Sequence, residues 1–155
     1  LNKNIIQYIR ENFNLLVGDA TAEKIKLSIG SVFAADQPVE MAVSGRDLIN
    51  GLPKEIVITD SEIREAIARS VRTIVSNIKS TIESTPPELV ADIYRRGIVL
   101  SGGGALLRGL DALVRQEARI PVAVIDDPLT CVVRGAGLVL EDLDNLKDVL
   151  LPSTH

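Results

Sequence analysis

Residues 97–110 have the sequence GIVLSGGGALLRGL, which decides the fold class of this chain. The continuous apolar run at 98–100 is typical of a strand that is covered on both faces. Three glycines follow it directly and leucines then recur at helical spacing, so the pattern predicts strand, tight turn and helix. A second apolar strand at 121–125, and a final helix capped by Asp127 ahead of Pro128, complete a right-handed crossover with a parallel strand pair. We therefore expect an α/β fold.

The glycine-rich turn at 102–104 is the first candidate for a ligand site. Without side chains at this corner, a flat ligand could lie against the main chain and the helix N-terminus. Both phosphate fingerprints are incomplete, because Leu107 occupies the third glycine position of the dinucleotide motif and Leu110-Asp111 replaces the Lys-Ser/Thr of a P-loop. A neutral, apolar-edged turn suits adenosine better than phosphate. Two interpretations stay open: an adenosine contact, or a tight connection that needs glycine only for its backbone conformation.

The N-terminal part predicts a smaller region of mixed helix and strand. Apolar residues spaced at three and four predict a helix over 2–16 and a second helix over about 19–28. Apolar and polar residues alternate at 38–44 and again after Pro53, on either side of the turn-forming Asn50-Gly51. This pattern predicts an antiparallel strand pair.

Two helices are expected between these regions. Asp60 gives an N-cap signal, and apolar residues from Ile63 to Ile82 then repeat at three and four, the most regular helical pattern in the chain. A further helix starts at Thr85-Pro86 and ends at the arginine pair and glycine of 95–97, where the arginines compensate the helix dipole. Its apolar side chains, within 89–93, are expected to be buried.

Composition excludes several classes of function. The 155 residues carry 17 basic and 21 acidic side chains, a net charge of −4, which offers no electrostatic footprint for nucleic acid. The only cysteine, Cys131, has no internal disulfide partner, so a reducing cytoplasm is the expected compartment. The only histidine, His155, is the last residue, which argues against histidine-based triads and zinc sites. No apolar run reaches the roughly 18 residues that span a bilayer.

Three other groups could carry chemistry. Glu23 and Lys26 lie one turn apart on the second helix, and on the residues alone we interpret them as a solvated ion pair. The carboxylates Asp126 and Asp127 could bind magnesium, but a helix cap ahead of Pro128 explains Asp127 more simply. We interpret Cys131 as a buried structural thiol, because no histidine is available to activate it.

Six blocks of sequence carry a family resemblance. They are NFNLLVG at 12–18, TAEKIK at 21–26, GRDLINGLP at 45–53, TPPELVADI at 85–93, GIVLSGGGALLRGL at 97–110 and DPLTCVVRG at 127–135. Taken in this order, from about residue 1 to 143, they resemble the MreB family, bacterial actin homologues that organise rod-shaped cell growth. One departure is Ala68-Arg69-Ser70, where the family commonly has a helix-interrupting proline, which puts the subdomain boundary in doubt.

The resemblance covers the second half of the family's chain. It implies an incomplete actin-like ATPase domain II, a ribonuclease H-like α/β fold with a small α+β subdomain. Residues 1–65 would form subdomain IIB, with two helices and the antiparallel pair, residues 66–143 subdomain IIA, and residues 144–155 a tail. The first phosphate loop, the groups that position the attacking water and the membrane-inserting loop belong to the half that is not covered. We therefore expect no catalytic residue here and no ATP hydrolysis by this chain alone.

The resemblance also implies a nucleotide site between the two subdomains, with the adenosine end on this half. Gly103 and Gly104 would pack against the nucleotide, and Leu106 and Leu107 would border the adenine. Glu23 and Lys26 would reach the ribose or the edge of the base. The implied cofactor is ATP or ADP with Mg²⁺, whose phosphates and metal are held mainly by the other half.

The function implied is that of a cytoskeletal ATP-binding protein. Its subunits would self-associate into filaments in the cytoplasm at the inner face of the cell membrane, with membrane-associated cell-elongation proteins as partners. Membrane contact would come through the half that is not covered, and nucleic acid is not an expected partner. Two alternatives stay open: a non-catalytic protein-docking module on the same scaffold, or another actin-superfamily ATPase such as a sugar kinase or chaperone.

Overall fold

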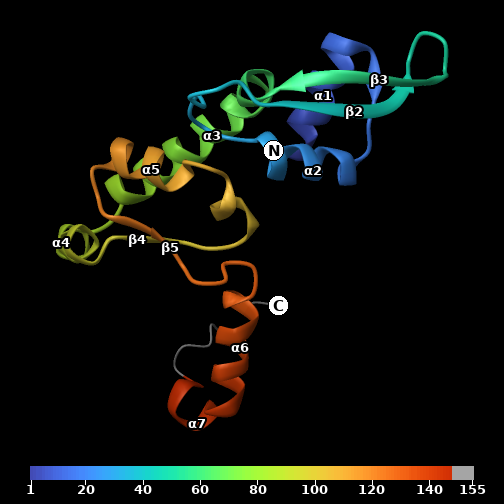
Figure 1. Ribbon diagram of the computed structural model, residues 1–155. Helices are drawn as coiled ribbons and strands as arrows, with labels where there is room; N and C mark the ends of the chain where they lie inside the picture. Colours follow the sequence, from blue (N-terminus) through green and yellow to red (C-terminus); the bar gives the residue numbers. More distant parts are fainter. Residues whose placement is uncertain (148–155) are drawn as a thin grey trace.

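The computed structural model describes residues 1–147 and divides them into two units that share one long helix, α3 (Figure 1). The N-terminal unit contains α1 (Asn2–Phe13), β1 (Leu15–Leu16), α2 (Asp19–Ile29), β2 (Glu40–Asp47) and β3 (Pro53–Thr59), followed by α3 (Asp60–Glu83). The C-terminal unit contains α4 (Pro87–Arg96), β4 (Ile98–Leu100), the 3-10 turn η1 (Gly103–Leu106), α5 (Leu110–Ala118), β5 (Val122–Val124), α6 (Cys131–Glu141) and α7 (Leu143–Leu146). The predicted α/β class is confirmed.

The N-terminal sheet has three antiparallel strands in the order β1-β2-β3 rather than the predicted two. The helix predicted over 2–16 ends at Phe13, because Asn14 turns into the left-handed conformation with φ 52°. Leu16, expected on the apolar helix face, instead lies in β1 opposite Arg46 and is 44% exposed. The expected antiparallel pairing of β2 with β3 is confirmed, with Val43 opposite Ile56.

The core of the N-terminal unit lies between this sheet and the three helices α1, α2 and α3. The expected inward residues of α2 are buried, and α3 contributes one buried residue per turn over its first half. The fully buried aliphatic side chains here are Ile5, Ile9, Leu15, Ala22, Ile25, Ile58, Ile63 and Ile67. With so few aromatic residues, isoleucine supplies most of this packing.

The long helix α3 begins at Asp60, the predicted cap residue, so the helix starts one residue earlier than predicted. Thr59 is the N-cap: its hydroxyl accepts from the Glu62 amide, and the Glu62 side chain accepts from the Thr59 amide at 2.7 Å. Asp60, expected as the cap, is the first helical residue and is only 5% exposed. Its carboxylate accepts from the Val39 amide at 3.1 Å and pairs with Arg64 at 3.1 Å, so it joins the start of β2 to the helix.

The C-terminal unit contains the predicted parallel pair, with Ile98, Val99 and Leu100 opposite Val122, Ala123 and Val124. Two details of the prediction are wrong. The helix after the glycines does not start at once, because η1 intervenes and α5 begins only at Leu110. The strand β4 is not covered on both faces, since Val99 is 63% exposed.

The helices α4 and α6 also differ from the prediction. The helix α4 begins at Pro87 with Pro86 as its N-cap, and Leu89, expected to be buried, is 55% exposed. The helix α6 begins at Cys131 after Thr130 rather than after Asp127, and both α6 and α7 extend away from the rest of the C-terminal unit (Figure 1). The sequence predicted burial for the apolar side chains of α4, but the described part of the chain leaves no residue of this helix buried.

The proposed division into subdomains stays a prediction, and its boundary at 65/66 falls inside α3. Of the predicted tail over 144–155, the first part belongs to α7, and residues 148–155 lie outside the described residues. Within the described range, no helix has both the length and the apolar character needed to cross a membrane.

Candidate functional site

The glycine-rich turn leaves the end of β4 and forms one side of the candidate site. Gly102 has φ 78° and donates its amide to the Pro128 carbonyl at 2.8 Å, which ties the turn to the segment before α6. A side chain built at Gly103 would contact Leu129 at 3.3 Å, whereas one at Gly104 would meet nothing within 4 Å. Both glycines are exposed, so the main chain at Gly104 is open to close approach by a ligand.

The two leucines of this turn have different environments. Leu106 is 46% exposed, so its side chain can border a ligand beside the glycines. Leu107 is only 6% exposed and belongs to the hydrophobic core. Of the two predicted adenine contacts, Leu106 has the more suitable surroundings.

Glu23 and Lys26 form the second side of the candidate site, on α2. Their side chains pair at 2.7 Å, which confirms the ion pair expected from their spacing. Asn2, from the start of α1, joins them: its amide donates to Glu23 Oε2 at 2.8 Å, and its carbonyl oxygen accepts from Lys26 at 3.2 Å. Sequence reasoning missed Asn2, because nothing in the local pattern brings the first turn of α1 beside α2.

Asn2 and Lys26 keep the Glu23 carboxylate ionised and fix its orientation. Hydrogen bonds from Lys26 and then Asn2 lower the pKa of Glu23, against the opposing effect of burial. Both bonds end on Oε2, so Oε1 has capacity for a hydroxyl donor from a ligand. The Lys26 side chain is 14% exposed and that of Glu23 43%, so the carboxylate is the more accessible member.

Arg108 connects the two sides. Its guanidinium donates to the carbonyls of Ser28 and Gly30 at the end of α2, and its own carbonyl accepts from the Val32 amide at 3.0 Å. The structure thus joins the 28–32 segment, at the end of α2, to Arg108, four residues after Gly104. Among the described residues, no hydrogen bond or ion pair joins Glu23 or Lys26 directly to Gly103 or Gly104. Sequence reasoning missed Arg108. This residue lies in one of the six family-like sequence blocks, but no local pattern indicates its partners.

The remaining sequence candidates have structural roles. Asp127 has φ 50° and accepts from the Thr130 hydroxyl, so it closes the turn before α6. In residues 1–147 there is no group of three or more His, Cys, Asp or Glu side chains placed to hold a metal ion. Cys131, expected to be buried, is partly exposed, and its thiol donates to the Pro128 carbonyl at 3.4 Å.

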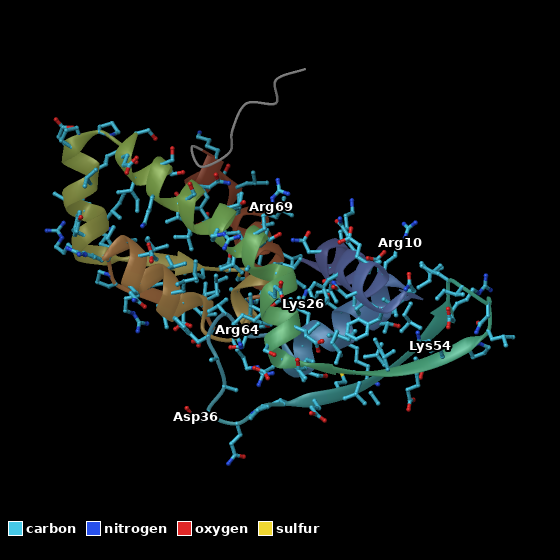
Figure 2. The ribbon with its side chains drawn as sticks, turned by 90° about the horizontal axis from the view of Figure 1, so that it is seen from above. Arg10, Lys26, Asp36, Lys54, Arg64 and Arg69 are labelled. Carbon is cyan, nitrogen blue, oxygen red and sulfur yellow. The ribbon has the colours of Figure 1, made fainter. Side chains whose placement is uncertain are left out.

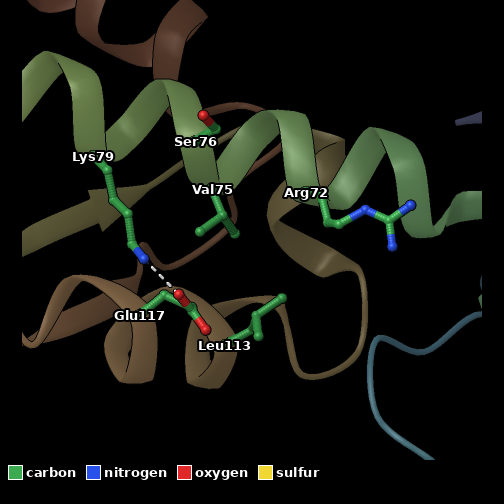
Figure 3. Close-up of a pocket in the computed structure, with 6 residues that line it drawn as sticks. All are labelled: Arg72, Val75, Ser76, Lys79, Leu113 and Glu117. Carbon is green, nitrogen blue, oxygen red and sulfur yellow. Dashed lines mark hydrogen bonds and ion pairs between the residues drawn. The ribbon is translucent and has the colours of Figure 1, made fainter.

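A pocket of about 380 Å³ lies elsewhere, between α3 and α5 (Figure 3). Lys79 and Glu117 pair across it at 2.5 Å, so its charges are mutually compensated on that side. None of the candidate adenosine residues lines it. The residues that do are Arg72, Val75, Ser76, Lys79, Leu113 and Glu117.

The arrangement of the two units is shared with proteins of known structure. The chain is similar to MreB5 of Spiroplasma citri bound to ADP, with a TM-score of 0.86 at 35% identity over 94% of this chain and 45% of that one. It is also similar in fold to the MamK double helical filament, with a TM-score of 0.73 at 23% identity. The fold is therefore that of an actin-like α/β protein, present in part.

Sequence comparison identifies the family. The model of the MreB/Mbl protein family matches residues 1–148. The chain is 49% identical over 140 residues to the cell shape-determining protein MreB of Escherichia coli K12, covering 90% of this chain and 40% of that protein. It is 44% identical over 142 residues to the cell shape-determining protein Mbl of Bacillus subtilis 168, covering 92% of this chain and 43% of that protein.

The chain belongs to the MreB/Mbl family, as the six sequence blocks predicted. It spans less than half the length of the curated relatives that it matches. The docking-module and sugar-kinase alternatives find no support among these relatives.

Proposed function

We propose that this chain supplies the adenosine-binding half of a bacterial actin-like protein that assembles into filaments and organises cell shape and wall elongation. The observation that carries the proposal is the pairing of an open main chain at Gly104 with the oriented Glu23 carboxylate, joined through Arg108. Relatives in this family are cell shape-determining proteins, and MreB5 of Spiroplasma citri has been solved with ADP and with AMPPNP. Both facts support the proposal.

Each group has a distinct role in holding the nucleotide. The face of the base lies against the main chain of Gly103 and Gly104, where a side chain would stand in its way. Leu106 borders the adenine with its exposed side chain, and Leu107 adds its small exposed part. Glu23 accepts hydrogen bonds from the ribose hydroxyls, and Lys26 holds the carboxylate in place and reaches the ribose or base edge.

The phosphates and Mg²⁺ depend on groups outside this chain. The described residues offer no cluster of metal ligands, and the turn that follows β4 carries no lysine. Mg²⁺ bound to the phosphates would supply charge neutralisation there. This half therefore contributes selection and orientation of the nucleoside.

Assembly and location form the wider part of the proposal. The protein associates with further copies of itself into filaments, and the double helical filament of MamK, which shares the fold, supports this part. We place these filaments in the cytoplasm at the inner face of the membrane, together with membrane-associated cell-elongation proteins.

Ligand-dependent melting tests the nucleotide site. ADP in excess should raise the melting temperature of the chain, by an amount equivalent to about 2.7 kcal/mol when its concentration is 100 times the dissociation constant. Gly104→Ala should abolish the response while leaving the unliganded protein folded, because the added methyl meets nothing within 4 Å. Gly135→Ala in α6 is the matched control and should keep the rise in melting temperature with ADP.

Two results would refute the proposal. No response to ADP or ATP in the unmodified chain would leave the docking-module interpretation standing. An equal response in Gly104→Ala would move the nucleotide away from the glycine-rich turn.

A further inference from the structure

Arg108 reaches from the loop before α5 to the C-terminal end of α2. Its Nη2 donates to the Ser28 carbonyl and its Nε to the Gly30 carbonyl at 3.3 Å. Among the described residues no carboxylate lies within ion-pair distance of this guanidinium. The contacts of Arg108 are therefore with backbone carbonyls 78 and 80 residues away in the sequence.

The chemistry of these carbonyls explains why an arginine occupies this position. The last carbonyls of a helix have no intrahelical donor, and the C-terminal end of the helix carries a partial negative charge. A guanidinium is cationic and has several N–H groups in one plane, so it can serve two neighbouring carbonyls at once. A lysine ammonium is also cationic but lacks this fixed fork.

Main-chain and packing contacts also join residues 108–109 to the segment that follows α2. The Val32 amide donates to the Arg108 carbonyl at 3.0 Å, and Ser31 forms an isolated parallel bridge with Arg108. At the next residue, Gly109, an added Cβ would come within 2.8 Å of the Phe33 ring. Residues 108–109 are thus fastened to 28–33 by side chain, backbone and packing.

This connection is separate from the other link between the units. The helix α3 packs against α2 in one unit and α5 in the other, and Figure 2 shows it running along both. Packing contacts close to the axis of α3 resist rotation about that axis only weakly, because their lever arm is short. The attachment at Arg108 lies away from the helix, so it resists this rotation more strongly and helps to hold the separation between α2 and the glycine-rich turn.

We propose that Arg108 is a positioning residue that sets the distance between the two sides of the adenosine site. This proposal rests on the function proposed above, because one nucleoside must contact both sides of the site, Glu23 with Lys26 and Gly103 with Gly104. Arg108 itself does not touch the ligand; it holds α2 where the carboxylate can reach the ribose while the base lies on the turn.

Distance measurement between spin labels tests the fastening without nucleotide. In a Cys131→Ser background, nitroxides at the exposed positions Lys24 on α2 and Gln116 on α5 report the separation of the units. The distribution should be narrow in the parent and broad in Arg108→Ala. Arg108→Lys should narrow it in part, since one of the two carbonyls regains a donor.

The matched control is Arg95→Ala, which removes an arginine whose one ion pair within residues 1–147 is with Asp92 on its own helix. It should leave the distance distribution unchanged. A narrow, unshifted distribution in Arg108→Ala would overturn the fastening role. If Arg108→Ala does not fold, Arg108→Gln and Arg108→Lys decide the question by the same criterion.

Binding of unmodified ADP, measured by isothermal titration calorimetry, tests the consequence for the site. Arg108→Ala should weaken binding roughly tenfold, with partial rescue in Arg108→Lys and none of this loss in Arg95→Ala. A broadened distance distribution with unchanged affinity would refute the positioning role. If the parent chain binds no nucleotide, the proposed function fails and the site role of Arg108 with it, whereas the distance data still decide whether Arg108 fastens the units.

Discussion

Gly97, the residue between α4 and β4, provides the sharpest stability prediction. Its backbone has φ 86° and ψ −173°, a region that essentially only glycine occupies. A Cβ at this position would lie 2.6 Å from the Pro121 carbonyl oxygen and 3.1 Å from the Pro121 Cβ. The same carbonyl accepts from the Ile98 amide at 2.8 Å, which continues the β4–β5 pairing. Gly97→Ala therefore both strains the backbone and displaces a hydrogen bond.

The size of the effect follows from these two costs. Backbone strain of this kind costs about 1–3 kcal/mol. Weakening the hydrogen bond to Pro121 adds about 1 kcal/mol. We expect Gly97→Ala to lower the free energy of unfolding by about 2–4 kcal/mol, a large share of the 5–15 kcal/mol that is usual for a domain.

Urea unfolding followed by far-UV circular dichroism measures this loss. Gly135→Ala is the matched control, because its methyl meets nothing within 4 Å and it lies inside α6. There alanine should stabilise by about 0.5–1 kcal/mol, since it restricts the unfolded chain and favours helix. A loss below about 1 kcal/mol in Gly97→Ala would contradict the strain assigned to this glycine.

Three further predictions concern the N-terminal unit and α3. Ile67→Ala, at a position with no exposure, should cost about 2–5 kcal/mol in urea unfolding, and a smaller loss would mean that the site collapses around the cavity. Thr59→Ala removes the capping box with Glu62 and should lower the stability by about 1 kcal/mol; an unchanged urea midpoint would show that the cap is dispensable. The pKa of Asp60 lies below its ordinary 3.8, chiefly because the Val39 amide donates to it, and the pKa of Glu23 lies below its ordinary 4.5. Each ionised carboxylate therefore contributes folding stability that is complete above its ordinary pKa and is lost as the pH falls through its lowered pKa. Acid titration monitored by circular dichroism should show a loss of folded protein below about pH 4, and this loss should be shallower in Asp60→Asn.

Regular apolar spacing made much of the fold predictable. The pattern from Ile63 to Ile82 indicated α3 because side chains at spacings of three and four share one helix face. The parallel pair followed from two short apolar runs separated by a helical segment. The strand β1 could not be predicted, because two residues have no periodicity and Leu15-Leu16 becomes a strand only by pairing with β2.

The site could be predicted only where its contacts are local. The spacing of Glu23 and Lys26 fixed their pairing on α2. Asn2 and Arg108 join the site from 21 or more residues away, and their roles depend on how the helices pack. The adenosine contacts of Gly103 and Gly104 stay predictions, supported by the open space at Gly104.

Because α3 is one continuous helix, a small tilt at one end produces a larger displacement at the other end. Its 24 residues extend roughly 36 Å at 1.5 Å per residue. A tilt of about 5° at its first turn would carry its last turn sideways by roughly 3 Å on this geometry. A rearrangement too small to break any packing beside α2 thus grows, at the opposite end of the same rod, into a displacement as long as a hydrogen bond.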